Sequence, residues 1–105
     1  MMRIMGLAIT VHGSRVELSG AVDLETSPSL RAELVDLINT AGAGTQLRLD
    51  LSAVTLLDSS GLSVLIAAHR LALGRDVRLE LAEVPEHVQR TLSVTGLDEV
   101  LHIAA

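Results

Sequence analysis

The sequence predicts a small α/β fold, in which a mixed β-sheet opens with a hairpin, continues with parallel strands and carries helices mainly on one face. From residue 27 onward, strand-like and helix-like segments alternate, and this alternation favours parallel pairing. Before it, two strand-like segments are separated only by the turn at residues 12–14, which is typical of a hairpin. The chain has 105 residues, of which 49% are hydrophobic. This is enough to bury one core, so residues 1–105 are expected to form a single domain.

The opening hairpin and the first helix are predicted from short-range patterns. Residues 7–11 are rich in β-branched side chains, and residues 15–19 alternate between polar and apolar. A connecting stretch, residues 20–26, leads to the first helix, with Ser27 as the expected N-cap and Pro28 as the first helical residue. The residues spaced to form the inner face of this helix are Leu30, Leu34, Leu37, Ile38 and Ala41, and residues 42–44 end it.

A central strand, a second helix and three shorter elements follow. Residues 46–51 alternate strictly, and residues 53–57 continue the strand toward a pair of serines. The second helix is predicted from about Ser60 to Gly74, and its expected inner side consists of Leu62, Leu65, Ile66, His69, Ala72 and Leu73. The remaining elements are a strand at residues 76–81, a third helix opened by Pro85 with Val88 and Leu92 inward and ended by Thr95 and Gly96, and a short strand at residues 100–103.

Composition excludes several classes of function. The net charge is −5, all eight basic residues are arginines without a basic block, and Phe, Tyr and Trp are absent, so direct nucleic-acid binding is not expected. The lack of cysteine removes disulfide and thiol chemistry. No apolar run approaches the roughly 18 residues that cross a bilayer, and no signal peptide is recognisable. We therefore expect a cytoplasmic protein without a membrane span.

The most informative segment joins the central strand to the second helix and contains Asp58, Ser59, Ser60 and Gly61. A hydroxyl at a helix N-terminus can be a cap, a nucleophile or a phosphorylation target. Catalysis is disfavoured because the Gly-x-Ser-x-Gly elbow is absent. This elbow needs a glycine two positions before the serine, but Asp58 stands two positions before Ser60, and Leu57 stands two positions before Ser59.

Metal and cofactor chemistry are equally unsupported by the sequence. The four histidines lack the spacing of a base or a zinc site, and without lysine there is no phosphate-binding P-loop. No enzyme activity, cofactor or metal is therefore expected.

A plain helix start is the alternative that competes most directly with a modification site. Asp, Ser and Gly all suit an N-terminus, and one cap is worth about 1 kcal/mol. Yet a single cap suffices, whereas here an acid and two hydroxyls stand together, and the glycine removes bulk beside the second hydroxyl. We expect Ser60 to be accessible to another protein.

Four segments in order, residues 20–30, 47–54, 57–62 and 92–97, resemble the STAS domain family, in particular the small stand-alone anti-sigma-factor antagonists of bacteria. The resemblance spans about residues 7–103 and implies a STAS-like fold, which agrees with the element order. It also implies partner switching. In that family, the unphosphorylated antagonist binds an anti-sigma factor that is a serine kinase and frees the sigma factor, phosphorylation blocks binding, and a serine phosphatase restores it.

By resemblance, the phosphorylated position is Ser60, and the partner-binding residues are Asp23, Thr26, Asp58, Ser59, Gly61 and Leu62. Two other functions stay open: a non-switching STAS subunit bound to a transporter ATPase, and a scaffold subunit of a stress-signalling assembly. The high apolarity also leaves a homodimer open.

Overall fold

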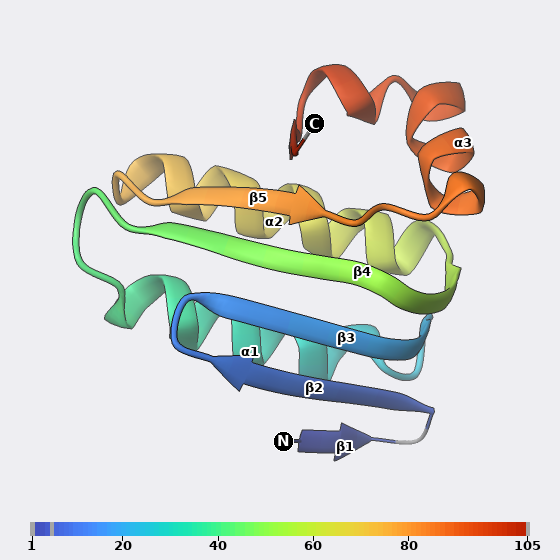
Figure 1. Ribbon diagram of the computed structural model, residues 1–105, viewed down its shortest axis with the longest axis horizontal. Helices are drawn as coiled ribbons and strands as arrows, with labels where there is room; N and C mark the ends of the chain where they lie inside the picture. The colour runs from blue at the N-terminus through green and yellow to red at the C-terminus, as the bar shows by residue number, and fades with distance from the viewer. Residues whose placement is uncertain (1, 5, 105) are drawn as a thin grey trace.

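A computed structural model of the chain describes residues 2–4 and 6–104 and contains a six-stranded sheet flanked by helices (Figure 1). The elements are β1 (Met2–Ile4), β2 (Leu7–His12), β3 (Arg15–Val22), α1 (Ser27–Thr40), β4 (Gln46–Leu57), α2 (Ser59–Gly74), β5 (Arg78–Ala82), α3 (Glu86–Thr95), the 3₁₀ turn η1 (Leu97–Glu99) and β6 (His102–Ile103). The strands lie in the sheet in the order in which they occur in the sequence.

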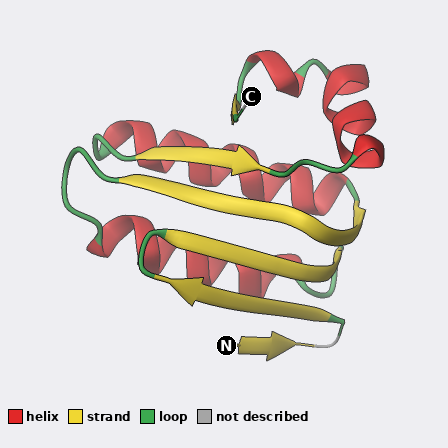
Figure 2. Ribbon diagram, viewed as in Figure 1, coloured by secondary structure: helices red, strands yellow, loops and turns green. Residues whose placement is uncertain are grey.

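Strand pairing confirms the predicted arrangement of a hairpin followed by parallel strands. The pairs β1–β2 and β2–β3 are antiparallel, whereas β3–β4, β4–β5 and β5–β6 are parallel. Figure 2 shows α1 and α2 side by side behind the sheet and α3 beyond the end of β5. Both long helices follow parallel strands, so both begin at the edge where β3 and β4 end, and the segment around the serines lies at that edge.

Two strand predictions need correction. No strand was expected at Met2–Ile4, where β1 pairs with β2 in a register that aligns Arg3 with Ala8. In addition, β3 continues to Val22 through much of the stretch expected to be a connection. It remains paired with β4 through register shifts on either side of Ser19 and Gly20, which let the two strands stay parallel up to Leu57.

The helices agree with the prediction in place and differ in detail. Helix α1 begins at Ser27 with Thr26 as the N-cap residue, so the expected cap was one residue too late. Leu37 of α1 and Ala41, the C-cap residue of this helix, are only partly buried. In α2, the buried residues are Gly61, Leu62, Val64, Leu65, Ala68, His69 and Ala72, whereas Ile66 is half-buried and Leu73 is exposed. Compared with the predicted face, the buried face of α2 is turned toward α1. Val64 belongs to this face and lines a groove together with residues of α1.

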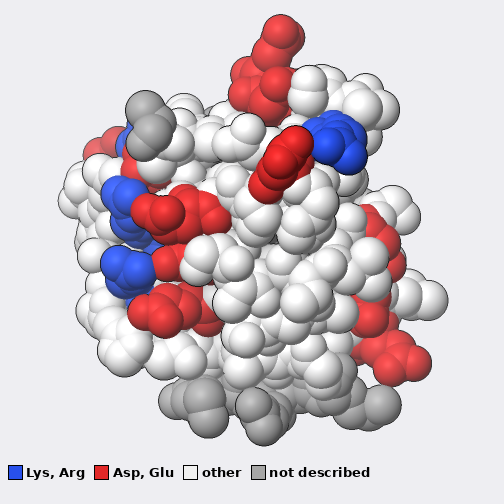
Figure 3. All heavy atoms as spheres, turned by 45° about the vertical axis from the view of Figure 1, so that its right-hand side comes forward, with Lys and Arg blue, Asp and Glu red and all other residues white. Residues whose placement is uncertain are grey.

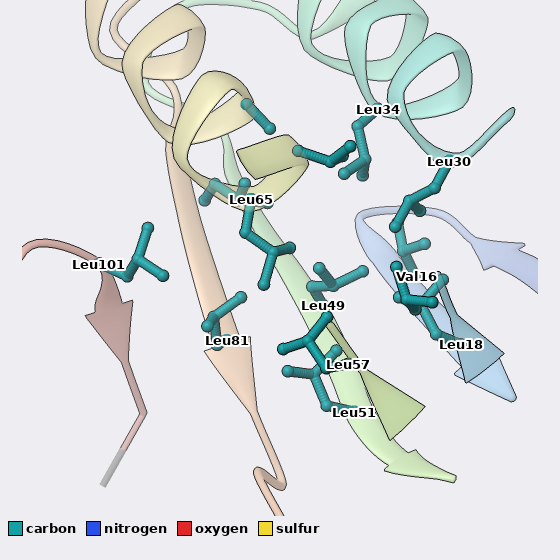
Figure 4. Close-up of a cluster of buried hydrophobic side chains, with 14 of the residues drawn as sticks. Val16, Leu18, Leu30, Leu34, Leu49, Leu51, Leu57, Leu65, Leu81 and Leu101 are labelled. Carbon is teal, nitrogen blue, oxygen red and sulfur yellow. The ribbon is translucent and has the colours of Figure 1, made fainter. Parts of the chain in front are cut away.

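The core lies between the sheet and the two long helices. Figure 4 shows Leu30 and Leu34 of α1 and Leu65 of α2 pointing toward the strands, where Val16, Leu18, Leu49, Leu51 and Leu81 meet them. Val88 and Leu92 of α3 are buried as predicted. Within the described residues, no helix combines the length and apolarity of a bilayer-spanning segment. That residues 1–105 form one domain stays a prediction.

The other face of the sheet is polar and carries charges that pair between neighbouring strands and within β5. Arg15 Nη2 lies 2.6 Å from Asp50 Oδ2, and Arg48 and Arg78 lie 3.6 Å and 3.5 Å from carboxylate oxygens of Glu80. Figure 3 shows basic and acidic side chains side by side at the left of the view. Arg15 Nε also lies 3.5 Å from Glu17 Oε1, so this cluster combines three arginines with three carboxylates and has the mixed charge of a solvated surface.

Candidate functional site

Asp58 starts helix α2 and holds the backbone of the predicted site. Its backbone is extended, and its Oδ1 accepts hydrogen bonds from the N–H groups of Ser60 at 2.9 Å and Gly61 at 3.1 Å. The Asp58 N–H donates to the carbonyl of Val22 at 3.2 Å, which ties the helix start to the end of β3. The side chain is thus an N-cap, and it occupies two N–H groups at the helix N-terminus that an anion could otherwise use.

The structure gives a packing reason for the glycine at position 61. A Cβ at this position would lie 2.5 Å from Leu57 Cδ1, 2.8 Å from Val22 Cγ1 and 3.1 Å from the Val22 carbonyl oxygen. Real Cβ atoms essentially never come that close to other atoms. The missing side chain therefore lets the first turn of α2 pack directly against the ends of β3 and β4.

The two serines occupy the first turn of α2 and differ in exposure. Ser59 is exposed, and Ser60 is half-buried in a shallow groove between the first turns of α1 and α2. The residues that line the groove are Ser27, Pro28, Arg31, Ser60, Ser63 and Val64. The Ser60 side chain therefore reaches a surface, which is the condition that any modification of its hydroxyl must meet.

The loop between β3 and α1 is held by Asp23 and Thr26. Asp23 Oδ1 accepts from the backbone N–H groups of Glu25 at 3.0 Å and Thr26 at 3.1 Å. The Thr26 hydroxyl donates to the Ala21 carbonyl at 2.9 Å and accepts from the Asp23 N–H at 3.0 Å. Thr26 is completely buried, so it can act on a partner only by shaping this loop.

The two remaining predicted partner-binding residues, Gly61 and Leu62, directly follow the serines in the sequence. Unlike Ser59, both are buried. Leu62 is 8% exposed and belongs to the core, and Gly61 is buried as well. The exposed apolar groups at this edge are instead Leu24, 75% exposed in the β3–α1 loop, and Leu56, 48% exposed near the end of β4. Sequence reasoning missed both leucines, because an exposed leucine cannot be distinguished from a core leucine by its type alone.

The histidines lie away from this site. His69 is 5% exposed on α2, and its ring packs edge-on against the His102 ring of β6, with centroids 5.0 Å apart. Burial lowers the pKa of His69, and electrostatic interaction with His102 and Arg70 lowers it further. The His69 Nδ1 atom is buried and has no hydrogen-bond partner among the described residues. This places a neutral imidazole in the core.

Comparison with known proteins decides the family. Residues 5–103 match the family model described as Mlab, STAS domain. The chain belongs to the STAS domain family. This match covers nearly the whole sequence and includes the strand end, the serines and the last helix together.

Several similar proteins and solved structures are named as anti-sigma factor antagonists. The anti-sigma-B factor antagonist of Bacillus subtilis is 32% identical over 91 residues, which cover 87% of this chain and 81% of the relative. An anti-sigma factor antagonist from Mycobacterium paratuberculosis has a similar structure, with a TM-score of 0.76 and 25% identity over 92% of this chain and 82% of that one. The unphosphorylated form of the antagonist SpoIIAA shares the STAS fold, with a TM-score of 0.73 and 20% identity over 94% of this chain and 88% of that one.

Proposed function

We propose that this STAS protein is an anti-sigma-factor antagonist that switches partners through Ser60. One observation carries the proposal: the Ser60 side chain reaches a surface groove in the first turn of α2, in a chain that is 32% identical to an anti-sigma-B factor antagonist. In its unmodified form the protein binds an anti-sigma factor with serine kinase activity, and this binding releases the sigma factor.

The chemistry of the switch is a phosphoryl transfer. The kinase moves the γ-phosphoryl group of ATP to Ser60 Oγ, the hydroxyl proton leaves, and ADP is the second product. A serine phosphatase reverses the change by hydrolysis of the phosphate ester. The added group carries about −1.5 to −2 charges and three acceptor oxygens at neutral pH.

The docking surface lies at the edge where β3 and β4 end. Leu24 and Leu56 supply exposed apolar area there, and Asp23 and Asp58 supply negative charge. Ser59 is exposed beside them, while Thr26, Gly61 and Leu62 support the surface from below. A complementary partner is basic around apolar pockets, as is typical where charged rims surround a desolvated centre.

Phosphorylation blocks docking by local occlusion, because the phosphate fills the space in which the partner contacts the Ser60 hydroxyl, and the added charge is repelled by Asp58 on the same turn. The N–H groups of Ser60 and Gly61 already donate hydrogen bonds to Asp58, so they are not free to bind a phosphate on Ser60. Burial of a doubly charged group against a partner that fits a hydroxyl costs about 3 kcal/mol, which corresponds to roughly a hundredfold weaker binding.

Binding and modification assays test this function. We expect Ser60→Ala to bind a candidate anti-sigma-factor kinase like the wild type, and Ser60→Asp to bind about a hundredfold more weakly. The matched pair Ser14→Ala and Ser14→Asp, in the exposed turn before β3 and away from the docking surface, is the control for added charge. Intact-mass and phosphopeptide analysis after incubation with kinase and ATP should locate one phosphate, on Ser60. Equal affinity of Ser60→Ala and Ser60→Asp would contradict the proposal.

A non-switching subunit bound to a transporter ATPase is the second candidate. It is favoured by the observation that capping by Asp58 and packing of Gly61 account for much of the Asp-Ser-Ser-Gly sequence without any modification. This candidate predicts no phosphate transfer from any kinase and constant binding to the ATPase by all four serine variants.

A scaffold role in a stress-signalling assembly predicts a large particle by light scattering, and a homodimer predicts twice the mass of the chain.

A further inference from the structure

The groove that contains Ser60 also contains a positive charge, and this bears on where a phosphate on Ser60 would go. Ser60 lies on α2, and Arg31 lies opposite it on α1, with both side chains lining the same groove. The backbone of α2 offers less to a phosphate than a bare helix N-terminus does, because Asp58 accepts the N–H groups of Ser60 and Gly61. A side-chain partner is therefore the main way to compensate the added charge within this molecule.

Arg31 is available for such a role. Across residues 2–4 and 6–104, its guanidinium has no carboxylate within 4.0 Å, whereas four other arginines form ion pairs. These paired arginines are Arg15, Arg48, Arg78 and Arg90. Arg31 is exposed in the first half of α1, so its long side chain can turn along the groove.

A second polar group in the groove also lacks a partner. Ser27 is only 6% exposed, yet it lines the groove, and its hydroxyl makes no hydrogen bond among the described residues. The Ser27 oxygen is not one of the fully buried polar atoms without a partner, so it opens into the groove, where a ligand that accepts hydrogen bonds can use it. The nearby Ser63 differs, since its hydroxyl donates to the Ser59 carbonyl at 3.0 Å.

We propose that the groove between α1 and α2 is an intramolecular phosphate site, in which Arg31 pairs with a phosphate on Ser60 and the Ser27 hydroxyl donates a further hydrogen bond. This inference rests on the proposed phosphorylation of Ser60. Guanidinium groups bind phosphate through two parallel hydrogen bonds, which gives geometry as well as charge compensation. The phosphorylated form is then an ordered state, with its phosphate held between the helices.

Phosphorus NMR on protein with phosphoserine installed at position 60 during translation tests the site without any kinase or partner. The second pKa of phosphoserine, ordinarily about 6, is expected to be lower in the wild type than in Arg31→Gln, because the guanidinium favours the dianion. Arg70→Gln is the matched control: Arg70 is exposed and has no carboxylate within 4.0 Å among the described residues. It lies about 15 Å from Ser60 along α2 and should leave the pKa unchanged.

Two further variants separate charge from geometry. Arg31→Lys should restore part of the lowered phosphate pKa, because it keeps the charge and loses the planar pair of donors. Ser27→Ala should raise the phosphate pKa by less than Arg31→Gln does. As a second measurement, a cycle of Ser60→Glu and Arg31→Gln should show a favourable coupling in melting temperature that Ser60→Glu and Arg70→Gln lack.

The same phosphate pKa in the wild type, Arg31→Gln and Arg70→Gln, without coupling in the melting cycle, would overturn the phosphate site. This outcome is distinct from failure of the proposed function, since the phosphate is supplied without a kinase. A shifted pKa in a protein that no kinase modifies would leave the site standing and remove the switch.

Discussion

Gly61 is a residue at which the first turn of helix α2 packs tightly against the ends of β3 and β4. Its position shows how one missing side chain fixes the placement of the serines, because the first turn of α2 rests on Val22 and Leu57 at that point. Asp58 acts on the same turn from the other side, through its two hydrogen bonds to backbone N–H groups. The orientation of Ser60 toward the groove therefore depends on neighbours that never touch a partner.

The variant Gly61→Ala tests this packing. We expect it to lower the free energy of unfolding by about 1–3 kcal/mol, because the added methyl group overlaps Val22 and Leu57 and the helix must move. The control is Gly74→Ala at the end of α2, where nothing lies within 4 Å of the added carbon. Urea denaturation of both variants measures the difference. A Gly61→Ala protein as stable as Gly74→Ala would contradict the assigned role.

Arg15 and Asp50 give a second prediction for individual side chains. Burial alone would raise the pKa of Asp50, but hydrogen bonds from Ser52 and from Arg15 outweigh it, and the pKa is lowered. The Arg15→Gln substitution should lower the free energy of unfolding by about 1 kcal/mol at pH 7, since it leaves a buried carboxylate with fewer partners. The loss should shrink as the pH falls below the pKa of the carboxyl group. Arg78→Gln should change stability less, because Arg78 is half exposed and its Nε lies 3.5 Å from Glu80 Oε2, farther than Arg15 lies from Asp50.

Helix α2 shows which parts of an element can be predicted from sequence. Its existence and its start at the serines follow from a local pattern, because caps and apolar spacing depend on residues a few positions apart. Its buried face does not follow, since α2 packs against both the sheet and α1, and contact with α1 buries Val64 and leaves Leu73 exposed. Likewise β1 has only three residues, too few for a pattern, and depends on pairing with β2.

The candidate site was predictable in the same limited way. Ser60 and Asp58 could be located because they stand at a strand-to-helix junction. The burial of Thr26 could not, because it follows from the fold of the β3–α1 loop around its hydroxyl. The proximity of Arg31 to Ser60 also could not be read from the sequence, since it requires α1 and α2 to lie side by side.

The contact between α2 and β6 carries a prediction about pH. The pKa of His69 lies below its ordinary value of 6.5 because the ring is buried, so the unfolded chain binds a proton more readily than the folded one. The free energy of unfolding should therefore fall as the pH drops below about 6.5, until the pH reaches the lower pKa of the folded state. Thermal melts between pH 7.5 and pH 5 should show this loss for the wild type and less of it for His69→Leu. The exposed His87 provides the control His87→Gln, which should melt like the wild type throughout.

In the molecule as a whole, the sheet and its helices form a fixed scaffold. The two serines lie on this scaffold at the edge where β3 and β4 end. The core lies between the sheet and its two long helices, and Ser60 contributes no side-chain hydrogen bond to it within the described residues. The switch we propose therefore requires no change of fold.

A spectroscopic comparison tests this rigidity. We expect phosphoserine at position 60 to leave the far-ultraviolet circular dichroism unchanged, and amide chemical shifts to move only around the first turns of α1 and α2. Ser59→Asp serves as the control for charge on the exposed side of the same turn. Shift changes that extend through β1 and β2 would argue for a global rearrangement instead.

The outermost strands are also the shortest, three residues in β1 and two in β6, while the twelve-residue β4 lies inside the sheet. An unpaired strand border is a template on which further chains can add and grow into fibres, and apolar chains are most prone to this. Placing the longest strand between two neighbours leaves little free backbone for such growth. The architecture can therefore tolerate a chain that is 49% hydrophobic while resisting self-templated assembly.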